Sequence, residues 1–545
     1  MVYAHRRVAA VLLAGIPVVA LSGAAAADSK AEDAKLEAVE QQVRDLSAQI
    51  QDLKRSTADQ YADERSQQDS AVKVTLDNGR PTFSSADGKF TASIRALGQI
   101  DWGSYMQRRA SASLPAAYAP ALSSGANFRR VYLGVQGKLF GDWSYNFNFD
   151  FGGSGGTEAP GHIQSVYLEY DGLAPFAARI GAYPAPANLE DSTASGDTLF
   201  LERNAPSDLQ RNLAGGDGRD AVSLIYSGDR FFGAFSYTGN KIQETQAVFD
   251  EQQALLSRAS YLVYSDPDAH WLVGANGTYV IKPAGVIAGN VAFPGTALAN
   301  GSAKGAIALS DPPELTIDDN GLKLANTTAL SAGHVAQWGL ETAGNWQNIY
   351  GQAGFYDFEV DRAPENFTIF TAPSTSNAAL VRPRNDHFTG WYLEGAWTLT
   401  GESRNYNKAT GAFTPPKPSA PLDLEAGNWG AFELAGRYSD LNLNDRTRDP
   451  ANVVTGWSGA NKTYTYFDTV RGGDQRIWTA ALNWYPVNAI KFALQYQFIE
   501  ISKLQSGTTP STLIVVGPTA APPVLPTASA SQTIQTIGLR AQVQL

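Results

Sequence analysis

Residues 143–151 alternate strictly between aromatic and hydrophilic side chains. Every odd position from Trp143 to Phe151 is aromatic, and the even positions between them are serine, asparagine or aspartate. Because successive side chains of a β-strand point to opposite faces, this pattern predicts a strand with one aromatic face and one polar face. A transmembrane β-barrel presents two such faces, one to lipid and one to an aqueous lumen, whereas a sheet in a water-soluble protein rarely does.

Strand-like segments recur from residue 89 to the end of the chain. Sixteen are predicted, over residues 89–103, 128–138, 143–151, 162–170, 176–183, 220–227, 231–238, 258–265, 270–281, 332–345, 348–360, 387–398, 428–438, 476–485, 489–500 and 533–545. In the last segment, apolar residues occupy every odd position from Ile537 to Leu545, as expected of a final strand that pairs with the first. An even number of strands is typical of bacterial single-chain barrels.

The connections between these segments alternate in length. Short turns, such as residues 141–142, 228–230, 266–269 and 486–488, alternate with long loops at residues 104–127, 184–219, 282–331, 361–386, 439–475 and 501–532. Outer-membrane barrels have this asymmetry, with short turns in the periplasm and long loops outside. The connection at residues 399–427 should be periplasmic and yet is long, and the sequence offers no physical reason for its length.

The first 27 residues have the pattern of a secretory signal peptide. A basic stretch at residues 5–7 precedes an apolar run over residues 8–20, and the alanines before Asp28 offer an Ala-x-Ala cleavage site. The alternative, a transmembrane anchor, is disfavoured because the run is short and contains Pro17. Elsewhere the chain has no stretch of eighteen apolar residues, so the exported chain is not expected to be a helical membrane protein.

A heptad pattern predicts a short coiled-coil helix over residues 28–55. Its apolar positions are alternately three and four residues apart, at Leu36, Val39, Val43, Leu46, Ile50 and Leu53. This spacing places one apolar stripe along a helix, which a second helix covers in a coiled coil. The alternative is a single amphipathic helix that lies on another surface. So few heptads are marginal alone, so the helix is expected to rely on association imposed elsewhere, and the residue types do not specify the number of helices.

The predicted fold class is therefore all-β. A 16-stranded antiparallel transmembrane β-barrel over residues 87–545 is joined to the helix by a polar linker at residues 56–86. Composition agrees, because charged residues make up 17% of the chain, against about 25% in typical soluble domains, and aromatic residues 11%. The chain has no cysteine, which excludes disulfides, zinc thiolates and thiol nucleophiles.

Charge and motifs disfavour several classes of function. The net charge of −11 becomes −13 once the two arginines of the signal peptide are removed (−11 − 2), which disfavours nucleic acid as a partner. The exported chain has four histidines, His162, His270, His334 and His387, and none of them lies in a Gly-x-Ser-x-Gly or His-Glu-x-x-His motif. A phosphate-binding glycine loop of the Walker type is also missing from the sequence. We therefore expect no enzyme activity, no cofactor and no metal site.

Strand parity sorts the charged residues of the barrel. With the apolar register facing lipid, the cationic residues that point into the lumen are Arg95, Arg130, Arg179, Arg437, Lys491 and Arg540. The acidic residues that point inward are Asp101, Asp150, Glu169, Glu394 and Glu433. Two interpretations stay open: the charges pair and stiffen the wall, or they form a lining that selects ions. A lumen that is polar along every strand predicts a water-filled pore with at most a moderate charge preference.

Several segments resemble the phosphate-selective porin O and P family. The motifs occur in family order as NFRRVYL at 127–133, GDWSYNFNFD at 141–150, LERN at 201–204, TLTGE at 398–402, WGAFELAGRY at 429–438 and NWY at 483–485. The resemblance implies a sixteen-stranded trimeric outer-membrane channel whose loops fold inward to form a constriction. It also implies that Arg129 and Arg130 match an arginine pair of the family and belong to the candidate pore lining.

The resemblance is closer in the scaffold than in the selectivity site. Phosphate-type channels of the family carry closely spaced arginines after the ninth-strand region and a lysine just after a Leu-Glu pair. Here residues 277–304 contain only Lys282 and Lys304 as cations, and Asp191 follows the pair at 189–190. The sequence therefore favours a general porin over a phosphate-specific one.

The expected function is passive diffusion of small hydrophilic solutes and ions, including anions such as phosphate, across the outer membrane of a Gram-negative bacterium. A 16-stranded barrel is wide enough to leave an aqueous channel. The expected partners are outer-membrane lipid, lipopolysaccharide and the other copies of a homotrimer, with the coiled coil in the periplasm. One alternative is a channel specific for an anion or a sugar, which would need a charged or aromatic constriction in residues 184–219. The other is a structural tether to the periplasmic wall.

Overall fold

The computed structural model describes residues 29–70, 72–77, 79–109, 120–153, 161–242, 251–286, 304–372, 375–449, 453–458, 461–465, 468–504, 514–516 and 529–545. The predicted signal peptide, residues 1–27, lies outside the described residues. The chain divides into two compact units, residues 1–71 and residues 72–545. Within the described ranges, no helix is both long enough and apolar enough to cross a membrane.

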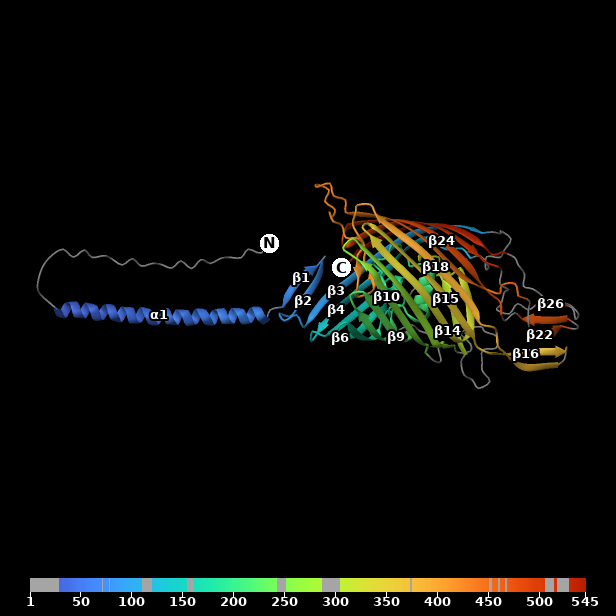
Figure 1. Ribbon diagram of the computed structural model, residues 1–545, viewed down its shortest axis with the longest axis horizontal. Helices are drawn as coiled ribbons and strands as arrows, with labels where there is room; N and C mark the ends of the chain where they lie inside the picture. Colours follow the sequence, from blue (N-terminus) through green and yellow to red (C-terminus); the bar gives the residue numbers. More distant parts are fainter. Residues whose placement is uncertain are drawn as a thin grey trace. The chain divides into compact units, whose positions relative to one another are not determined.

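The first unit contains the helix α1 (Ser29–Ser70), drawn in blue in Figure 1. The helix continues past residue 55, where the sequence predicted that a linker would begin. Residues 56–70 contain neither glycine nor proline, and alanine, glutamine, glutamate and arginine among them favour a helix. The six apolar residues of the heptad pattern are 52–70% exposed, so the apolar stripe is uncovered in the single chain.

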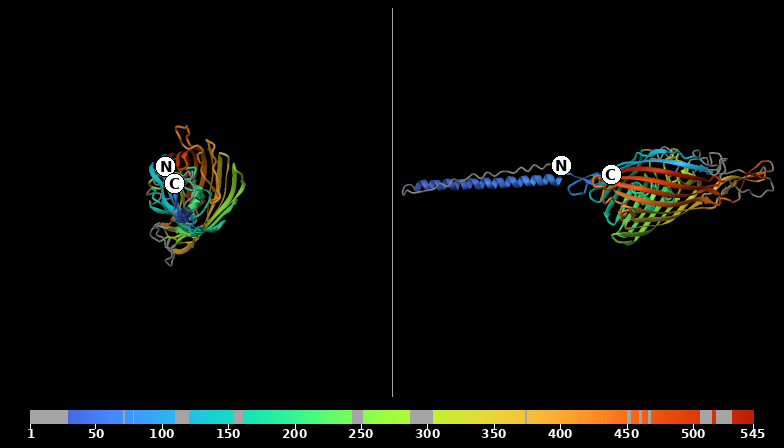
Figure 2. Two further views of the ribbon diagram at one scale, coloured as in Figure 1. Left: turned by 90° about the vertical axis from the view of Figure 1, so that its left-hand side faces the viewer. Right: turned by 90° about the horizontal axis from the view of Figure 1, so that it is seen from above.

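Sixteen strands among the described residues of the second unit form a closed antiparallel barrel (Figures 1 and 2). They are β3 (Thr91–Arg109), β4 (Gly125–Leu139), β5 (Trp143–Asp150), β6 (His162–Leu173), β7 (Phe176–Ala182), β8 (Arg219–Ser227), β9 (Phe231–Lys241), β10 (Gln253–Ser265), β11 (Ala269–Lys282), β14 (Ala325–Trp346), β15 (Ile349–Arg362), β18 (Asp386–Thr398), β21 (Ala431–Asp445), β24 (Val470–Val487), β25 (Ile490–Ser502) and β27 (Gln532–Gln544). Each strand pairs with the next, and β27 pairs with β3 to close the ring. The sixteen predicted strands are confirmed in number and order.

The two ends of the barrel differ in their connections. Tight turns join β4 to β5, β6 to β7, β8 to β9, β10 to β11, β14 to β15 and β24 to β25, and we call this the short-turn end. Longer connections join the strands at the opposite, long-loop end. The first barrel strand begins and the last one finishes at the short-turn end, where the Leu545 N–H donates to the Ala96 carbonyl (2.8 Å).

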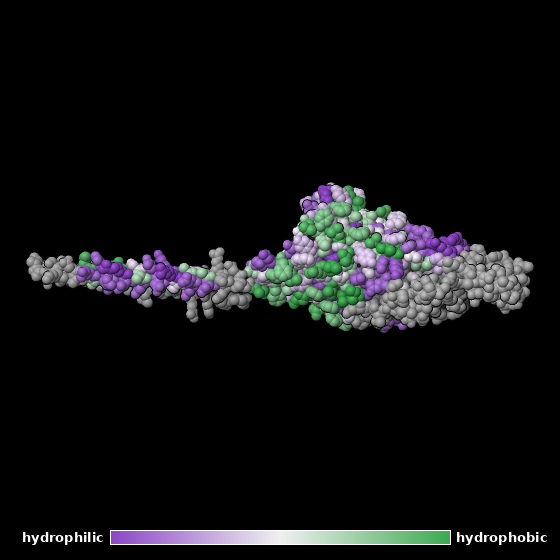
Figure 3. All heavy atoms as spheres, turned by 90° about the horizontal axis from the view of Figure 1, so that it is seen from below, coloured by the Kyte–Doolittle hydropathy of each residue, from purple (hydrophilic) through white to green (hydrophobic). Residues whose placement is uncertain are grey.

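The outer wall is apolar, as the alternation over residues 143–151 predicts. Trp143, Phe147 and Phe149 are 37–49% exposed on the outside, whereas Asn146 and Asn148 are buried inside the barrel. Aromatic rings of neighbouring strands meet near the short-turn end, in the pairs Trp143–Tyr170, Phe176–Tyr226, Phe432–Trp484 and Trp484–Phe492. Figure 3 shows hydrophobic residues gathered over the wall of the barrel. An apolar band with aromatic margins is the surface that a transmembrane barrel presents to lipid.

Smaller elements complete the second unit. The hairpin of β1 (Lys73–Asp77) and β2 (Arg80–Ser84) lies in the predicted linker and pairs with the start of β3. At the long-loop end are β12 (Gly285–Val286) with β13 (Lys304–Asp311), β16 (Glu365–Ala372) with β17 (Thr375–Val381), and a sheet of β22 (Val453–Ser458), β23 (Asn461–Thr465) and β26 (Ile514–Val516). Elements between barrel strands are α2 (Leu189–Ser192), α3 (Ala205–Ala214), β19 (Tyr406–Asn407) and β20 (Ala412–Phe413).

Candidate pore constriction

The connection from β7 to β8, residues 183–218, lies inside the barrel, and we call it the inner loop. Its backbone carbonyls accept hydrogen bonds from inward-facing side chains of the far wall. These bonds run from Gln542 on β27 to Gly196 (2.8 Å), from Lys491 on β25 to Thr198 (2.7 Å) and from Asn483 on β24 to Leu199 (2.9 Å). The inner loop therefore crosses the lumen and narrows it, which the family resemblance implied.

Asparagine caps give the inner loop its local fold. The side-chain oxygen of Asn188 accepts from the Asp191 N–H (2.8 Å) at the start of α2, and that of Asn204 accepts from the Ser207 N–H (3.0 Å) at the start of α3. Asn188 also donates to the side chain of Gln210 (2.6 Å), which ties α2 to α3. These short polar side chains at helix starts are the local sequence signal for the two helices.

A second segment, residues 312–324 before β14, enters from the long-loop end. Leu315 and Ile317 are both 1% exposed. The carboxylate of Glu314 accepts from the Ala205 N–H at the start of α3 (2.8 Å) and pairs with Arg437 on β21 (2.5 Å). This segment therefore holds α3 against the wall.

The long connection at residues 399–427 has a structural role, because residues 404–413 fold back into the barrel from the short-turn end, whereas residues 419–427 are exposed. We call it the insertion. Arg404 donates two hydrogen bonds to the inward-facing carboxylate of Glu433 on β21 (2.7 and 2.9 Å). Phe413 is buried against Tyr350 on β15, with ring centroids 5.1 Å apart.

Arg258 on β10 connects the insertion with the inner loop. Its guanidinium is fully buried and pairs with Glu341 on β14 (2.7 Å). It also donates to the hydroxyl of Ser192 in the inner loop (3.1 Å) and to the carbonyls of Thr410 and Gly411 in the insertion (2.8 Å each). Two segments that enter from opposite ends of the barrel therefore meet in its interior.

A cavity of about 180 Å³ remains between the inner loop and the inner faces of β3 to β7. On the wall side it is lined by Arg95, Tyr132, Asn146, Asn148, Gln164, Ser165, Tyr167 and Arg179. On the loop side it is lined by Tyr183, Pro184, Asp191, Thr193, Ala194, Ser195, Arg203, Arg211 and Asp217. Four arginines and two aspartates therefore line this cavity, together with neutral side chains.

Two of the four arginines are neutralised by carboxylates. Arg211 pairs with Asp191 (2.5 Å) and Asp217 (2.8 Å), and Arg179 pairs with Glu169 (2.7 Å). Burial acts to raise the pKa of Asp217, but Arg211 and neighbouring arginines outweigh burial and lower the pKa to about 2. Asp217 is therefore charged at neutral pH and cancels part of the arginine charge.

The other two arginines, Arg95 and Arg203, bond to neutral groups. Arg95 donates to the side-chain oxygen of Gln136 (3.1 Å). Arg203 donates to the carbonyls of Glu190 (3.1 Å) and Thr193 (3.0 Å). Within the described residues, neither guanidinium forms an ion pair, so both leave positive charge facing the cavity.

The predicted pair Arg129 and Arg130 braces the inner loop. Both side chains are buried in the barrel, because a β-bulge at this point of β4 turns two successive residues inward. Their guanidinium groups pair with Glu202 of the inner loop, Arg129 at 2.5 Å and Arg130 at 3.6 Å. Burial acts to raise the pKa of Glu202, and the two arginines outweigh it and leave the pKa below its ordinary value.

The remaining predicted lumen cations also point inward, and partners in the structure engage each of them. Arg540 pairs with Asp101 (2.6 Å), Arg437 with Glu314 and Glu394 (2.5 and 3.7 Å), Arg179 with Glu169, and Lys491 donates to a backbone carbonyl. For these residues the geometry fits the interpretation that the charges stiffen the wall. Of these predicted cations, Arg95 and Arg179 line the cavity, and within the described residues only Arg179 of these two has a carboxylate partner.

One side of the inner wall is apolar, and the expectation of a polar lining on every strand is wrong there. The inward positions of β10, β11, β14, β15 and β18 include Leu256, Val280, Val335, Phe358 and Tyr392, each at most 1% exposed. These side chains share a hydrophobic cluster with α3. Their side chains face inward, as strand parity requires, but they pack in this cluster with α3 and are not in contact with water.

Sequence reasoning missed four arginines that shape the constriction. Arg203 lies in the LERN motif, which marked its position but not its role, and Arg211 and Arg404 lie in connections without a periodic pattern. Arg258 stood at the first residue of its predicted strand, where parity is least certain, whereas β10 begins at Gln253. Strand parity would have identified Arg258 as inward-facing if that boundary had been placed earlier.

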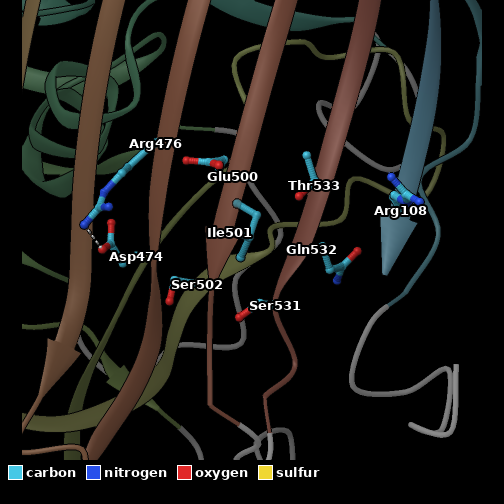
Figure 4. A pocket seen from close by; sticks show the side chains of 9 residues that line it. All are labelled: Arg108, Asp474, Arg476, Glu500, Ile501, Ser502, Ser531, Gln532 and Thr533. Atoms are coloured by element: carbon cyan, nitrogen blue, oxygen red, sulfur yellow. Dashed lines mark hydrogen bonds and ion pairs between the residues drawn. The ribbon is translucent and has the colours of Figure 1, made fainter. Parts of the chain in front are cut away.

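A second hollow, of about 510 Å³, lies at the long-loop ends of β24, β25, β27 and β3 (Figure 4). Arg476 hydrogen-bonds Asp474 (2.7 Å), and the strand register places Arg476 opposite Glu500 and Thr533 opposite Arg108. These residues occupy outward positions of their strands. The hollow therefore belongs to the outer surface of the barrel and not to the lumen.

The sequence is similar to a known family and to two relatives. The model of the family "Phosphate-selective porin O and P" matches residues 119–512. Porin O of Pseudomonas aeruginosa is 22% identical over 398 residues, which cover 70% of this chain and 78% of the relative. An uncharacterized protein of Caulobacter vibrioides is 25% identical over 457 residues, or 79% of this chain and 72% of the relative.

Among solved structures, the outer membrane channel DcaP of Acinetobacter baumannii is 10% identical, with a TM-score of 0.41, over 85% of this chain and 99% of that one. The outer membrane protein OmpT of Vibrio cholerae is 9% identical, with a TM-score of 0.42, over 83% and 98%. The family match, in contrast, spans most of the chain and confirms the resemblance seen in the motifs. The chain therefore belongs to the phosphate-selective porin O and P family and forms a channel in the outer membrane of a Gram-negative bacterium.

Proposed function

We propose that small hydrophilic anions diffuse passively through the cavity between the inner loop and β3 to β7. The observation that supports this proposal most directly is the pair Arg95 and Arg203, which line the cavity and form no ion pair within the described residues. The other charges of the cavity largely cancel. A constriction with surplus positive charge attracts anions and repels cations.

The same geometry favours weak and general anion binding over a tight phosphate site. Asp191 stands where phosphate-type channels of the family carry a lysine after the Leu-Glu pair, and it pairs with Arg211 (2.5 Å). Around Arg95 and Arg203 the lining consists of neutral donors and acceptors such as Ser165 and Asn146. An ion can exchange part of its hydration shell for these groups and still leave, which conduction requires.

The test is the reversal potential of the purified protein in a planar bilayer under a potassium chloride gradient. Arg95→Ala and Arg203→Ala should each move the reversal potential toward the value of a cation-selective pore. The double variant should move it furthest. The shift should shrink in concentrated salt, because the Debye length falls from about 10 Å at 0.1 M to about 3 Å at 1 M.

Arg476→Ala is the matched control, because it removes the same charge from the outer surface of the barrel. We expect it to leave the reversal potential unchanged. If the Arg95 and Arg203 double variant behaved like this control, anion selection at the cavity would be refuted. If the wild-type protein gave no conductance steps at all, the structural tether would be the better interpretation.

We also propose that the channel is a homotrimer and that the α1 helices of the copies associate. The stripe from Leu36 to Leu53 is at least half exposed along α1, and a second helix is the natural cover for such a stripe. The barrel contact should dominate, because a few heptads add little to a large interface. Deleting residues 28–72 should therefore leave a heat-sensitive oligomer on gels. A deletion variant that ran only as a monomer would make α1 the main source of assembly.

A further inference from the structure

We infer that solutes pass along one side of the barrel only, and that the insertion seals the other side at its periplasmic end. The inference rests on the proposed conduction through the cavity beside β3 to β7. It assigns a role to residues 399–427, the long connection at the end where short periplasmic turns are the rule. We call the apolar inner wall of β10, β11, β14, β15 and β18 the filled side, and the wall of β3 to β7 beside the cavity the open side.

At the long-loop end the filled side is occupied by α3. Leu209 and Leu213 of α3 share a hydrophobic cluster with Leu256 on β10 and Phe358 on β15. On the polar side of the helix, Gln210 donates to the hydroxyl of Thr278 on β11 (2.9 Å). Water and ions are excluded here by side chains packed as in a protein core.

At the short-turn end the insertion continues this filling. Its hairpin of β19 and β20 reaches the β8–β9 turn, where Lys408 pairs with Asp229 (3.2 Å). Gly411 has a φ of +59°, and a Cβ added there would lie 2.8 Å from the ring of Phe232 and 2.9 Å from the hydroxyl of Ser260. The tip of the insertion therefore lies directly against the inner faces of β9 and β10.

The insertion does not reach the side of the cavity. The hydrogen bonds and ion pairs that residues 403–414 make outside the insertion go to the end of β8 and the β8–β9 turn, to Arg258 on β10, to Glu433 on β21 and to Asp197 of the inner loop. The two ends of the insertion bond to Phe432 on β21 and to Pro486 on β24. Within the part of the chain that the structure describes, it makes no such bond to β3, β4, β5, β6 or β7. The side that carries Arg95 and Ser165 is thus left without this cover.

Buried hydrogen bonds fix the tip of the insertion to the barrel wall. Arg258 holds the carbonyls of Thr410 and Gly411 while its own charge is paired with Glu341, and both charged side chains are fully buried. Withdrawing the insertion would take away two carbonyl acceptors of this buried guanidinium, and leaving buried donors of a charged group without acceptors is strongly unfavourable. We therefore expect the insertion to stay in place during conduction.

Single cysteines test the inference cleanly, because the chain has no cysteine of its own. Ser165→Cys places a thiol on the cavity wall, and Ser260→Cys places one beneath the tip of the insertion. The two substitutions are chemically identical, and both serines are buried and face inward, at 6% and 2% exposure. The probe is a small charged methanethiosulfonate, with the modification read by mass spectrometry and the current read in a planar bilayer.

The expected result is that the reagent modifies Ser165→Cys and removes most of its current, while Ser260→Cys stays unmodified in the intact channel. Replacing residues 403–414 with a short Gly-Ser linker in the Ser260→Cys variant should make that thiol reactive and raise the conductance. The first comparison needs only full-length chains, so it stands even if the shortened variant does not fold.

The two readouts separate the possible failures. Equal modification of the two cysteines in the intact channel would overturn the one-sided path. Modification of Ser165→Cys alone, without any change of current, would keep the seal and refute conduction through the cavity. An unmodified thiol at position 260 after the replacement of residues 403–414, in a folded channel, would show that the insertion is not what covers it.

Discussion

The two sides of the barrel share an outer face but differ in their inner face. On β5, the outward Phe147 is followed by the inward Asn148, which faces the cavity. On β15, the outward Phe355 is followed by the inward Tyr356 and, two residues later, by Phe358, and both inward rings are completely buried. Lipid sets the outer face of every strand, whereas the inner face depends on whether water or an inserted segment lies against it.

Because of this difference, we expect the two sides of the barrel to contribute differently to stability and to ion flow. The strands on the filled side are buried on both faces, by lipid outside and by α3 or the insertion inside, as in sheets that are covered on both sides. The strands on the open side supply polar groups and Arg95 to the cavity, and the inner loop supplies Arg203. We therefore expect substitutions on the filled side to change mainly stability, and substitutions on the open side to change mainly ion flow.

The largest effect is expected from Phe358→Ala on the filled side. Truncating a fully buried phenylalanine leaves a cavity and should lower the free energy of unfolding by about 3–5 kcal/mol. The matched change on the open side, Asn148→Ala, removes one hydrogen bond to Gln164 and should cost about 0.5–1.5 kcal/mol. Reversible urea unfolding in lipid vesicles measures both values. Equal losses would mean that the two sides are packed alike.

An intermediate effect is expected from replacing Arg129 and Arg130 together with Ala. The pair braces Glu202 and does not line the cavity, so its charge is partly cancelled where it stands. The reversal potential should move toward cations, but by less than in the double variant of Arg95 and Arg203. A larger shift would place the selecting charge at the bulge of β4. No shift at low salt would leave the pair a purely structural role.

The smallest effect is expected from Asp191→Asn. This change removes one of the two close carboxylate partners of Arg211 and leaves Asp217 at 2.8 Å. The cavity then gains one net positive charge, so the reversal potential should move slightly toward anions. Asp474→Asn on the outer surface is the matched control. A shift toward cations would mean that Asp191 supports the fold of the inner loop more than it balances charge.

Local patterns were enough to predict the barrel. The alternation of residues 143–151, repeated in sixteen segments, placed every strand, because strand geometry and lipid contact act on each residue independently of the rest of the chain. Parity also placed Arg95 and Arg540 inside the lumen. It could not tell that Arg540 forms an ion pair while Arg95 forms none within the described residues, since Asp101, the partner of Arg540, lies at the opposite end of the sequence.

The residues that form the constriction could be identified only from the tertiary structure. Arg203 and Arg404 lie in connections without periodicity, and only the folding of these segments into the barrel brings them against the wall. One sequence signal pointed to this outcome: on β15, Tyr356, Phe358 and Val360 are apolar at inward positions, which suits a strand covered on both faces. The sequence by itself determined the outer face of the barrel, because every strand meets the same lipid. The structure decided the inner face, because what each inward side chain meets depends on segments distant in the chain.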